Sequence, residues 1–327
     1  MMTVSSLVTR RLFLGASAAT LAIGALPGMT RAATPISPGT VLRAGDQKGG
    51  NEAVMKAAGV LDDLPYKLQW NQFAAAAPLL EALNAGAVDT AYASDSPTTF
   101  ALASGVEARI VAAYRGSGAG TAIVVPANSP IHEIGQLKGH PIATNRGSVG
   151  HALLLAIAER EGWSADDIRL ANLLPSDAKA ALAAGSVEAW STWNVYVAQA
   201  QLVDGARVII DGGNGLLSGL SFVTATTTAI TEKRAALADF LGRLARARRW
   251  ALQNTDAYAR VLAAEIGVSE AVAKRWLETD SPRAVAIDDQ VIADEQRTAD
   301  RYQSARLIRA RLDATAVFDR SFNAAVS

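Results

Sequence analysis

The sequence predicts an α/β protein made of two lobes of like topology, followed by a helical C-terminal region. Short apolar, β-like runs alternate with helical patterns from residue 41 onward, which is typical of layered α/β folds. An internal repeat aligns ALNAGAVD at 82–89 with ALAAGSVE at 181–188, and five of the eight positions are identical at an offset of 99. After residue 230 charged helical patterns replace the alternation.

The first half of the chain is punctuated by clear helix signals. Gly59 and Gly86 each end a helical pattern, and Ser96 followed by Pro97 reads as a cap and a first helical residue. We expect strands at 41–46, 66–73, 88–93, 109–114 and 121–125, and helices at 51–59, 77–84 and from 96.

The pattern then restarts with a strand at 141–144 and a helix at 151–161. The strand, loop and helix of 41–59 thus have a counterpart in 141–162 at almost the offset of the repeat, which indicates two lobes of like topology. Four further helices are expected at 232–254, 255–266, 269–278 and 288–310. Their amphipathic spacing predicts that they pack on the lobes without a function of their own.

The first 33 residues read as an export signal. A basic start with paired Arg10 and Arg11 precedes a mildly apolar stretch and a small-residue cleavage site. Paired arginines followed by Leu-Phe-Leu resemble a twin-arginine signal. An ordinary secretory signal and an uncleaved anchor are the alternatives. We expect cleavage and a periplasmic, exported protein.

Composition excludes several classes of protein and site. Lys+Arg and Asp+Glu both number 31, and removal of 1–33 takes away three arginines and leaves a net charge of −3; a nucleic-acid binder would usually be basic. The chain has no cysteine, so it has no disulfide, thiol catalysis or Cys-based metal site. The three histidines show no zinc-binding spacing. We expect no metal and no cofactor.

Four strand-to-helix junctions carry the glycines and polar residues of a binding site, at 46–50, 94–97, 146–150 and 193–196. Ligands of open α/β sheets bind at the carboxyl ends of strands, where helix N-termini favour anions. The repeat pairs these junctions, because Asp95 shifted by 99 positions falls on Asn194. We expect each lobe to give two loops to one cleft.

Each feature also has a purely structural interpretation. The glycines serve tight turns equally well, and Ser96 and Ser148 serve as plain helix N-caps. Trp190, Trp193 and Tyr196 either pack in the core or form a cleft wall. Three aromatic residues within seven positions of an aromatic-poor chain favour the wall.

Residues 41 to about 225 resemble the aliphatic sulfonate-binding proteins of ABC importers, within the nitrate, sulfonate and taurine group of periplasmic binding proteins. The resemblance is carried by GDQKG at 45–49, LLEALNAG at 79–86, SDSP at 94–97, NRGS at 145–148, LPSDA at 174–178 and EAWSTWNVY at 188–196. The chain departs from the family pattern in two loops. Asn194-Val195 replace the usual Asp-Pro, and Asp46 precedes the glutamine where the family often has an aromatic residue.

The resemblance implies a periplasmic binding protein type II fold with a first lobe of 40–124 and 224–327 and a second lobe of 125–223. It implies a monomer that closes on its ligand by a hinge near 123–126 and 221–224 and delivers it to an ABC transporter permease. The ligand implied is an organic sulfonate, aliphatic or taurine-like, with nitrate, a sulfate ester or a thiamine precursor as alternatives.

A sulfonate has three acceptor oxygens and no donor, so its site must supply donors. Asp95 only accepts, so either protein N–H groups occupy it or it meets an ammonium group of the ligand. The candidate ligand-binding residues are Gln47, Asp95, Ser96, Arg115, Gly147, Ser148, His151, Trp190, Trp193 and Asn194.

The rival class is an enzyme that uses Ser148 as nucleophile and His151 as base. A Gly-x-Ser-x-Gly elbow is missing, because Arg146 fills its first glycine position. No orienting carboxylate is visible in the sequence. We therefore expect a binding protein and no catalytic residue.

Overall fold

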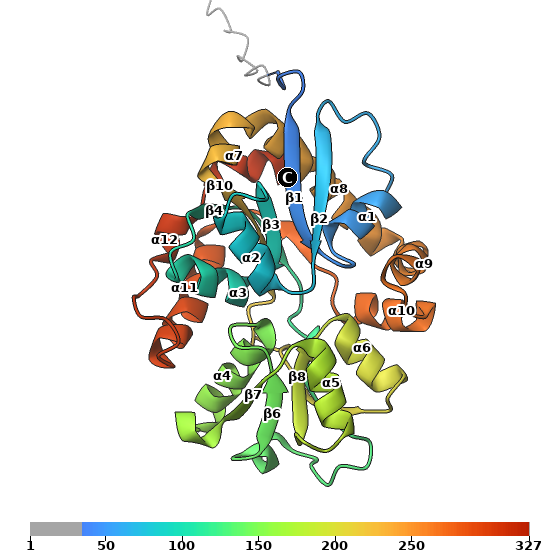
Figure 1. Cartoon of the computed structure of the whole chain (residues 1–327), viewed down its shortest axis with the longest axis vertical. Helices are drawn as coiled ribbons and strands as arrows, with labels where there is room; N and C mark the ends of the chain where they lie inside the picture. Colours follow the sequence, from blue (N-terminus) through green and yellow to red (C-terminus); the bar gives the residue numbers. More distant parts are fainter. Residues whose placement is uncertain (1–34, 327) are drawn as a thin grey trace, which may run out of the picture. The chain divides into compact units, whose positions relative to one another are not determined.

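β1 (Val41–Gln47) lies inside a six-stranded sheet in the computed structural model, which describes residues 35–326 (Figure 1). The sheet order is β11-β4-β10-β3-β1-β2. β1 pairs in parallel with β2 and β3, whereas β10 pairs antiparallel with β3 and β4. The other strands are β2 (Lys67–Phe73), β3 (Thr90–Ser94), β4 (Ala108–Arg115), β10 (Leu220–Thr226) and β11 (Arg283–Val285).

A second sheet repeats this arrangement with five strands in the order β7-β6-β8-β5-β9. β6 pairs in parallel with β7 and β8, and β5 pairs antiparallel with β8 and β9. Each sheet thus has a parallel trio followed by two strands in antiparallel pairing, to which the first sheet adds β11, and this confirms the like topology predicted from the repeat. The strands are β5 (Thr121–Val125), β6 (Pro141–Thr144), β7 (Arg169–Asn172), β8 (Ala189–Trp193) and β9 (Arg207–Asp211).

Three helices follow the parallel strands of each sheet. In the first sheet they are α1 (Asn51–Ala57), α2 (Ala76–Asn84) and α3 (Asp95–Ala103), and in the second α4 (Val149–Glu161), α5 (Pro175–Ala183) and α6 (Val195–Leu202). Short 3-10 helices occur at Ile134–Leu137, Ala165–Asp167 and Arg320–Phe322. Because α1, α3, α4 and α6 start directly after β1, β3, β6 and β8, their N-termini gather at the carboxyl ends of the parallel strands.

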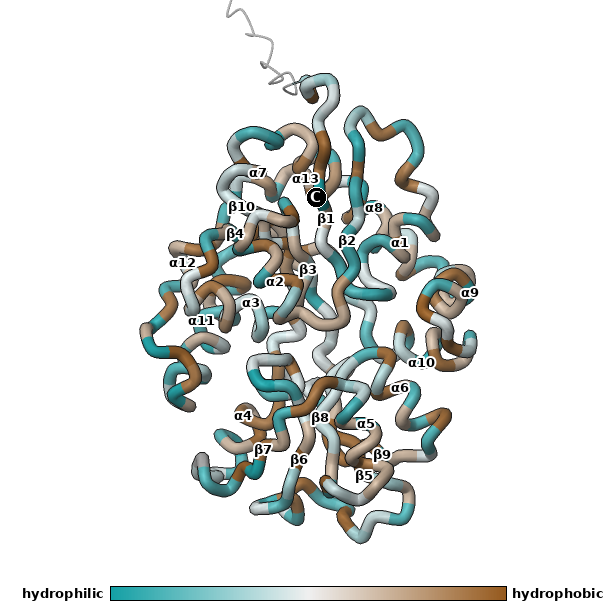
Figure 2. The backbone as a smooth tube through the Cα atoms, in the orientation of Figure 1, coloured by the Kyte–Doolittle hydropathy of each residue, from teal (hydrophilic) through white to brown (hydrophobic). Residues whose placement is uncertain are grey.

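The C-terminal region is helical, as predicted. It contains α7 (Thr227–Glu232), α8 (Arg234–Gln253), α9 (Thr255–Ile266), α10 (Glu270–Thr279), α11 (Asp289–Ser304), α12 (Ala314–Val317) and α13 (Asn323–Val326). Hydrophobic and hydrophilic residues alternate along α9 (Figure 2), which buries Tyr258 and Leu262. The last long helix ends six residues before the predicted residue 310, and sequence patterns missed β11, which pairs with β4 after Pro282.

Hydrophobic residues of each sheet pack against the helices that cover it. Leu42, Val111 and Val223 join residues of α8 and α9 in one core cluster. Ile123, Ile142 and residues of α4 form another under the five-stranded sheet. This burial of apolar surface is the main source of stability for both sheets.

The chain passes between the two sheets at 116–120 and 212–219, where glycines let two backbone segments touch. A Cβ on Gly219 would lie 2.4 Å from the Gly116 carbonyl oxygen, and one on Gly212 would lie 2.7 Å from the Gly118 oxygen. The crossings therefore differ from those expected at 123–126 and 221–224. Residues 123–125 lie within β5 and residues 221–224 within β10, because their backbone groups pair in the sheets.

The predicted export signal, residues 1–33, lies outside the described residues. Within 35–326, no helix is both long and apolar enough to cross a membrane.

Candidate functional site

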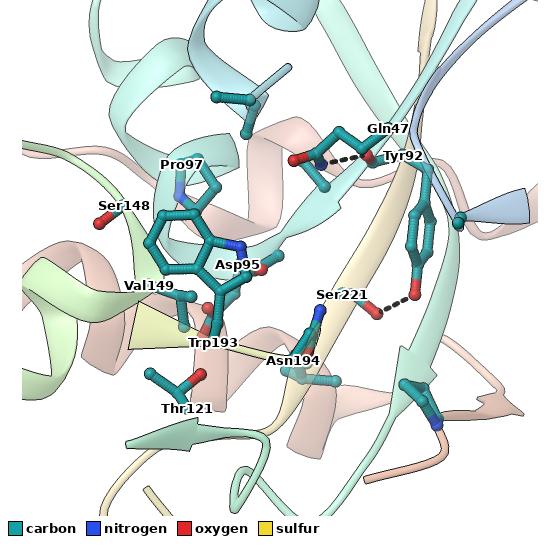
Figure 3. Close-up of a pocket in the computed structure, with 18 of the residues that line it drawn as sticks. Gln47, Tyr92, Asp95, Pro97, Thr121, Ser148, Val149, Trp193, Asn194 and Ser221 are labelled. Atoms are coloured by element: carbon teal, nitrogen blue, oxygen red, sulfur yellow. Dashed lines mark hydrogen bonds between the residues drawn. The ribbon is translucent and has the colours of Figure 1, made fainter. Parts of the chain in front are cut away.

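A cavity of about 760 Å³ lies at the carboxyl ends of the parallel strands of both sheets. Gln47 of β1, Ser94 of β3 and Trp193 of β8 line it, together with the first residues of α4. Figure 3 shows Gln47 and Tyr92 on one side of the cavity and Ser148 and Val149 on the other, with the Trp193 indole between them in this view. This is the position at which ligands of open α/β sheets bind.

Aromatic side chains are concentrated in this cavity. The chain has only six Trp, six Tyr and seven Phe, yet seven of these line the cavity: Phe73, Tyr92, Phe100, Trp193, Tyr196, Tyr258 and Trp276. Trp193 and Tyr196 meet edge to face, with ring centroids 6.1 Å apart. Such walls accommodate the apolar part of a ligand.

The N-terminus of α4 opens on the cavity next to Ser148. The Ser148 hydroxyl accepts a hydrogen bond of 3.2 Å from the backbone N–H of His151 and lies 3.3 Å from the Thr144 hydroxyl. Gly147 turns the chain into the helix with φ +76°, and a Cβ there would lie 3.2 Å from the Phe100 ring. Because first-turn N–H groups have no intrahelical acceptor, that of Val149 is available at the cavity surface.

The N-terminus of α6 opens on the same cavity through a strained residue. Asn194 has φ 52° and ψ −122°, and its N–H donates a 2.7 Å hydrogen bond to the Gly120 carbonyl oxygen. An uncommon backbone conformation of this kind persists only where surrounding contacts hold it. Val195 and Tyr196, the first residues of α6, line the cavity.

The corresponding helices of the first sheet already carry carboxylates. Asp46, at 0 % exposure, accepts a 2.8 Å hydrogen bond from the backbone N–H of Glu52 in the first turn of α1, and burial raises the pKa of Asp46 to about 6. Asp95 is the first residue of α3. The repeat places Asn145 and Asn194 where the first sheet has these two acids. α4 and α6 therefore have no acidic residue in their first turns, which favours an anion.

Both oxygens of the Asp95 carboxylate accept hydrogen bonds from protein groups. Oδ1 accepts from the Ser96 backbone N–H at 2.5 Å and the Ser96 hydroxyl at 2.9 Å. Oδ2 accepts from the hydroxyls of Ser218 at 2.5 Å and Thr298 at 3.2 Å. Of the two interpretations left open by the sequence, this arrangement favours the one in which protein groups occupy Asp95.

The cavity brings together Gln47, Asp95, Gly147, Ser148, Trp193 and Asn194 from the predicted set. The Gln47 amide donates to the Tyr92 carbonyl oxygen at 3.4 Å, and the Tyr92 hydroxyl lies 2.8 Å from that of Ser221. Six of the ten candidates thus share one surface, contributed by both sheets.

Four candidates lie elsewhere: Ser96, Arg115, His151 and Trp190. Ser96 is buried and bonded to Asp95, and Trp190 is buried in the core. Arg115 makes a 2.5 Å ion pair with Asp294 of α11 and donates to the Ser218 carbonyl oxygen. Its guanidinium therefore supports the crossing segment and does not face the cavity.

The His151 ring is buried behind the loop, which explains why it does not reach the cavity. Its Nδ1 accepts a 3.1 Å hydrogen bond from the Gly147 N–H, and the ring packs near Tyr302. Burial and the positive charge of Arg146 lower the pKa of His151 to about 4. Within 35–326 no hydrogen bond joins the Ser148 hydroxyl to this ring, so the pair lacks the geometry of a nucleophile and base.

Sequence reasoning missed the contribution of the C-terminal helices to the cavity. Arg248 of α8, Tyr258 of α9 and Trp276 of α10 line it, so these helices do more than pack on the sheets. The sequence signal for Arg248 is its spacing. It continues the buried apolar stripe of Leu241, Leu244 and Ala245, and a charged residue on such a stripe requires a special environment.

The glycines of the loop before α1 have structural reasons. A Cβ on Gly50 would lie 2.1 Å from Asp46 Oδ1, and one on Gly49 would lie 2.9 Å from the Ile266 side chain. Among the described residues no group of three or more His, Cys, Asp or Glu is placed to hold a metal ion.

Comparison with known proteins identifies relatives over most of the chain. A family model described as NMT1/THI5 like matches residues 67–257. A protein of Escherichia coli strain K12 named for aliphatic sulfonate binding is 32% identical over 294 residues, which cover 89% of this chain and 92% of that protein.

Two solved structures are similar in both sequence and fold. One is the alkanesulfonate-binding protein SsuA from Xanthomonas axonopodis pv. citri bound to MOPS, with a TM-score of 0.81, 31% identity, and coverage of 87% of this chain and 100% of that one. The other is the periplasmic aliphatic sulphonate binding protein SsuA from Escherichia coli, with a TM-score of 0.78, 30% identity, and coverage of 85% and 92%.

Proposed function

The chain belongs to the NMT1/THI5-like family and shares the fold of the SsuA proteins, and we propose that it is a solute-binding protein that captures an organic sulfonate and delivers it to an ABC importer. The observation that carries the proposal is the cavity at which α4 and α6 present N-termini with no acidic residue in the first turn, beside aromatic walls. The relatives named for sulfonate binding support the class of ligand.

The sulfonate group is assigned to the N-terminus of α4. Its three oxygens need donors, and the Val149 N–H, the Ser148 hydroxyl and the helix dipole supply them at the cavity surface. Asn194 assists, because an amide both donates and accepts, whereas the aspartate usual at this position in the family would repel an anion. Backbone donors held by a helix need little reorganisation on binding.

The organic part of the ligand lies against the aromatic residues. Trp193 and Tyr196 come from the second sheet, whereas Phe73 and Tyr92 come from the first. Contacts from both sides stabilise a closed state that neither side stabilises alone. Affinity therefore depends on closure of the cavity.

We assign the two sheets to two lobes that move about the crossing segments 116–120 and 212–219. The glycines of these segments absorb changes in backbone angles at low steric cost. The first lobe then contains the six-stranded sheet with the C-terminal helices, and the second contains the five-stranded sheet. Relative to the expected boundaries, β5 moves entirely to the second lobe and β10 entirely to the first.

We also propose that the paired arginines direct export of the protein and that the signal is cleaved near residue 33. The relative from Escherichia coli is described as periplasmic, which supports the same location here. Replacement of Arg10 and Arg11 by lysine tests the route, because a twin-arginine signal loses export and an ordinary secretory signal does not.

A binding role without catalysis is the reading that the site supports best. The Ser148 hydroxyl accepts from a backbone N–H, and the His151 ring lies outside the cavity with its Nδ1 already accepting a hydrogen bond. Incubation with sulfonates should return each of them unchanged, and release of sulfite or sulfate above the buffer rate would contradict this part of the proposal.

Titration calorimetry and thermal shift with a ligand panel test the function. The panel contains alkanesulfonates, arylsulfonates, taurine, nitrate, a sulfate ester and a thiamine precursor. We expect at least one organic sulfonate to bind with micromolar or tighter affinity and to exceed nitrate. No heat and no shift with any sulfonate would refute the proposed ligand class.

A further inference from the structure

A half-buried guanidinium faces the cavity from α8. Arg248 lines the cavity, and its Cζ lies 5.1 Å from the centroid of the Tyr92 ring and 5.9 Å from that of Tyr114. One terminal nitrogen donates a 2.7 Å hydrogen bond to the Asn51 side-chain oxygen. The two rings and this bond fix the guanidinium plane at the cavity wall.

Arg248 makes no salt bridge among the described residues, and the carboxylate of Asp46 acts on its charge only from a distance. No carboxylate of 35–326 lies within 4.0 Å of its guanidinium, whereas the partly exposed cations Arg43, Arg115, Lys233 and Arg243 each have such a partner. Its Nε is buried and makes no hydrogen bond. A partly buried cation that lines a cavity is stabilised when an anion meets its terminal nitrogens.

Asp46 is the acid of the same region, but it does not neutralise Arg248 by contact. One of its oxygens accepts the backbone N–H of Glu52, and burial raises its pKa. Its other oxygen is buried without a hydrogen bond. Asp46 thus offsets part of the charge of Arg248 from a distance, and Arg248 faces the cavity with one hydrogen bond, to Asn51, for its five N–H donors.

Arg248 and the α4 N-terminus lie on different sides of the cavity. Figure 3 shows Tyr92, whose ring Arg248 contacts, on the side opposite Ser148. The aromatic walls, including Trp193, line the space between them. The cavity thus has two places that favour acceptor groups and an apolar region in between.

We propose that Arg248 forms a second acceptor subsite, so that the preferred ligand carries, besides its sulfonate, a second acidic group such as a carboxylate at the far end of an apolar spacer. The inference rests on the proposed function, because it takes the α4 N-terminus as the sulfonate site. We place the second acidic group next to Arg248 because its positive charge attracts an anion and would repel a ligand amine.

Calorimetry with matched ligands tests the inference on the unmodified protein. Pairs that differ only in the terminal group, such as 4-sulfobenzoate with 4-carbamoylbenzenesulfonate and 3-sulfopropanoate with its amide, vary the charge at two spacer lengths. We expect the acid of at least one pair to bind about tenfold or more tightly than the amide, as for a charge-assisted hydrogen bond. Equal affinities in both pairs would overturn the inference.

The Arg248→Gln variant identifies the residue responsible. We expect it to remove the preference for the acid, so that the affinity for the acid falls about tenfold or more beyond any loss for benzenesulfonate. Arg249→Gln is the matched control, because this neighbouring arginine is exposed and does not line the cavity. An equal loss for benzenesulfonate would show that Arg248 holds the sulfonate itself.

The outcomes separate the inference from the function on which it rests. If sulfonates bind with the same affinity whether or not they carry a second acidic group, the inference is overturned and the proposed function stands. Absence of binding by every sulfonate contradicts the proposed function as well. If Arg248→Gln does not fold, Arg248→Lys keeps the positive charge and should retain the preference for the acid, and its loss of preference would overturn the role of the charge.

Discussion

The hydroxyl of Ser218 donates a 2.5 Å hydrogen bond to the carboxylate of Asp95. Asp95 lines the cavity, and Ser218 belongs to the crossing segment 212–219. Arg115 holds the same serine through its carbonyl oxygen. One small polar network therefore joins the wall of the cavity to the crossing segment between the sheets. A substitution at Asp95 removes hydrogen bonds that also hold this crossing segment.

Asp95→Asn should destabilise the fold without changing ligand selectivity. An amide replaces one carboxylate oxygen by a donor that faces donors, so we expect a loss of about 1–3 kcal/mol in the free energy of unfolding. Because protein groups fill Asp95, taurine and propane-1-sulfonate should weaken by the same factor in calorimetry. A loss confined to taurine would mean that Asp95 contacts a ligand ammonium group.

Ser148→Ala should weaken sulfonate binding by about tenfold, which corresponds to about 1.4 kcal/mol. The change removes a hydroxyl at the cavity and the cap of α4, whose oxygen accepts the His151 N–H. Calorimetry with the best sulfonate of the panel measures the effect. An unchanged affinity would remove Ser148 from the ligand contacts.

The control for Ser148→Ala is Thr226→Ala. Thr226 caps α7 by accepting the Ala229 N–H at 3.1 Å and contributes nothing to the cavity. Both variants should lose about 1 kcal/mol of stability by loss of a cap. Only Ser148→Ala should lose affinity, and an equal loss in both would assign the effect to stability.

Glu295→Gln should be tolerated at neutral pH. Glu295 is fully buried and accepts a 2.5 Å hydrogen bond from the Thr99 hydroxyl. Burial and the nearby charge of Asp95 raise its pKa well above the ordinary value. The folded state therefore keeps a proton that the unfolded state loses, so this group favours folding at low pH and loses that contribution as pH rises through its folded pKa.

Denaturant unfolding between pH 5 and 9 checks the Glu295 prediction. The wild type should lose stability relative to Glu295→Gln as the pH rises, because glutamine cannot ionise. Glu295→Ala supplies the comparison for packing and should be the least stable. A parallel pH dependence for wild type and Glu295→Gln would show that the carboxyl group is already ionised in the fold.

His151 should reduce stability in acid. Its pKa is lowered to about 4 in the fold, whereas the unfolded value is about 6.5, so the unfolded state binds more protons between these values. Stability falls as pH decreases through this window, with a slope of at most about 1.4 kcal/mol per pH unit from this group. Asp46, with its raised pKa, contributes in the opposite sense over part of the window.

Comparison of the wild type with His151→Gln isolates the pH-dependent contribution of His151 to stability, because Asp46 is present in both proteins and its contribution cancels. The difference in unfolding free energy between wild type and variant should change with pH between about 6.5 and 4 and stay constant above that range. A constant difference throughout would contradict the buried, neutral histidine.

The repeat explains why the layout of the sheets could be predicted from sequence. Helix ends at Gly86 and Gly185 mark equivalent units, and the parallel trios of both sheets follow from them. The crossings could not be located, because β5 and β10 are apolar strands like their neighbours and their sheet membership depends on long-range pairing. The glycines at 116–120 and 212–219 are the signal that sequence reasoning passed over.

The junction loops were the informative part of the sequence for the site. Position at strand ends was enough to bring Gln47, Ser148 and Asn194 to one cavity. It did not distinguish side chains that face the cavity from those that support it, as the burial of His151 shows. Arg248 of α8 lies more than 50 residues beyond the last junction at 193–196, and only tertiary packing brings it to the cavity.

A crystal structure of the protein with a bound arylsulfonate tests the central claim most directly. We expect the sulfur, located by anomalous scattering, at the N-terminus of α4. The sulfonate oxygens should lie at hydrogen-bond distance from the Val149 N–H and the Ser148 hydroxyl, with the ring against Trp193. A sulfonate bound away from α4, or a cavity that stays empty at saturating ligand, would contradict it.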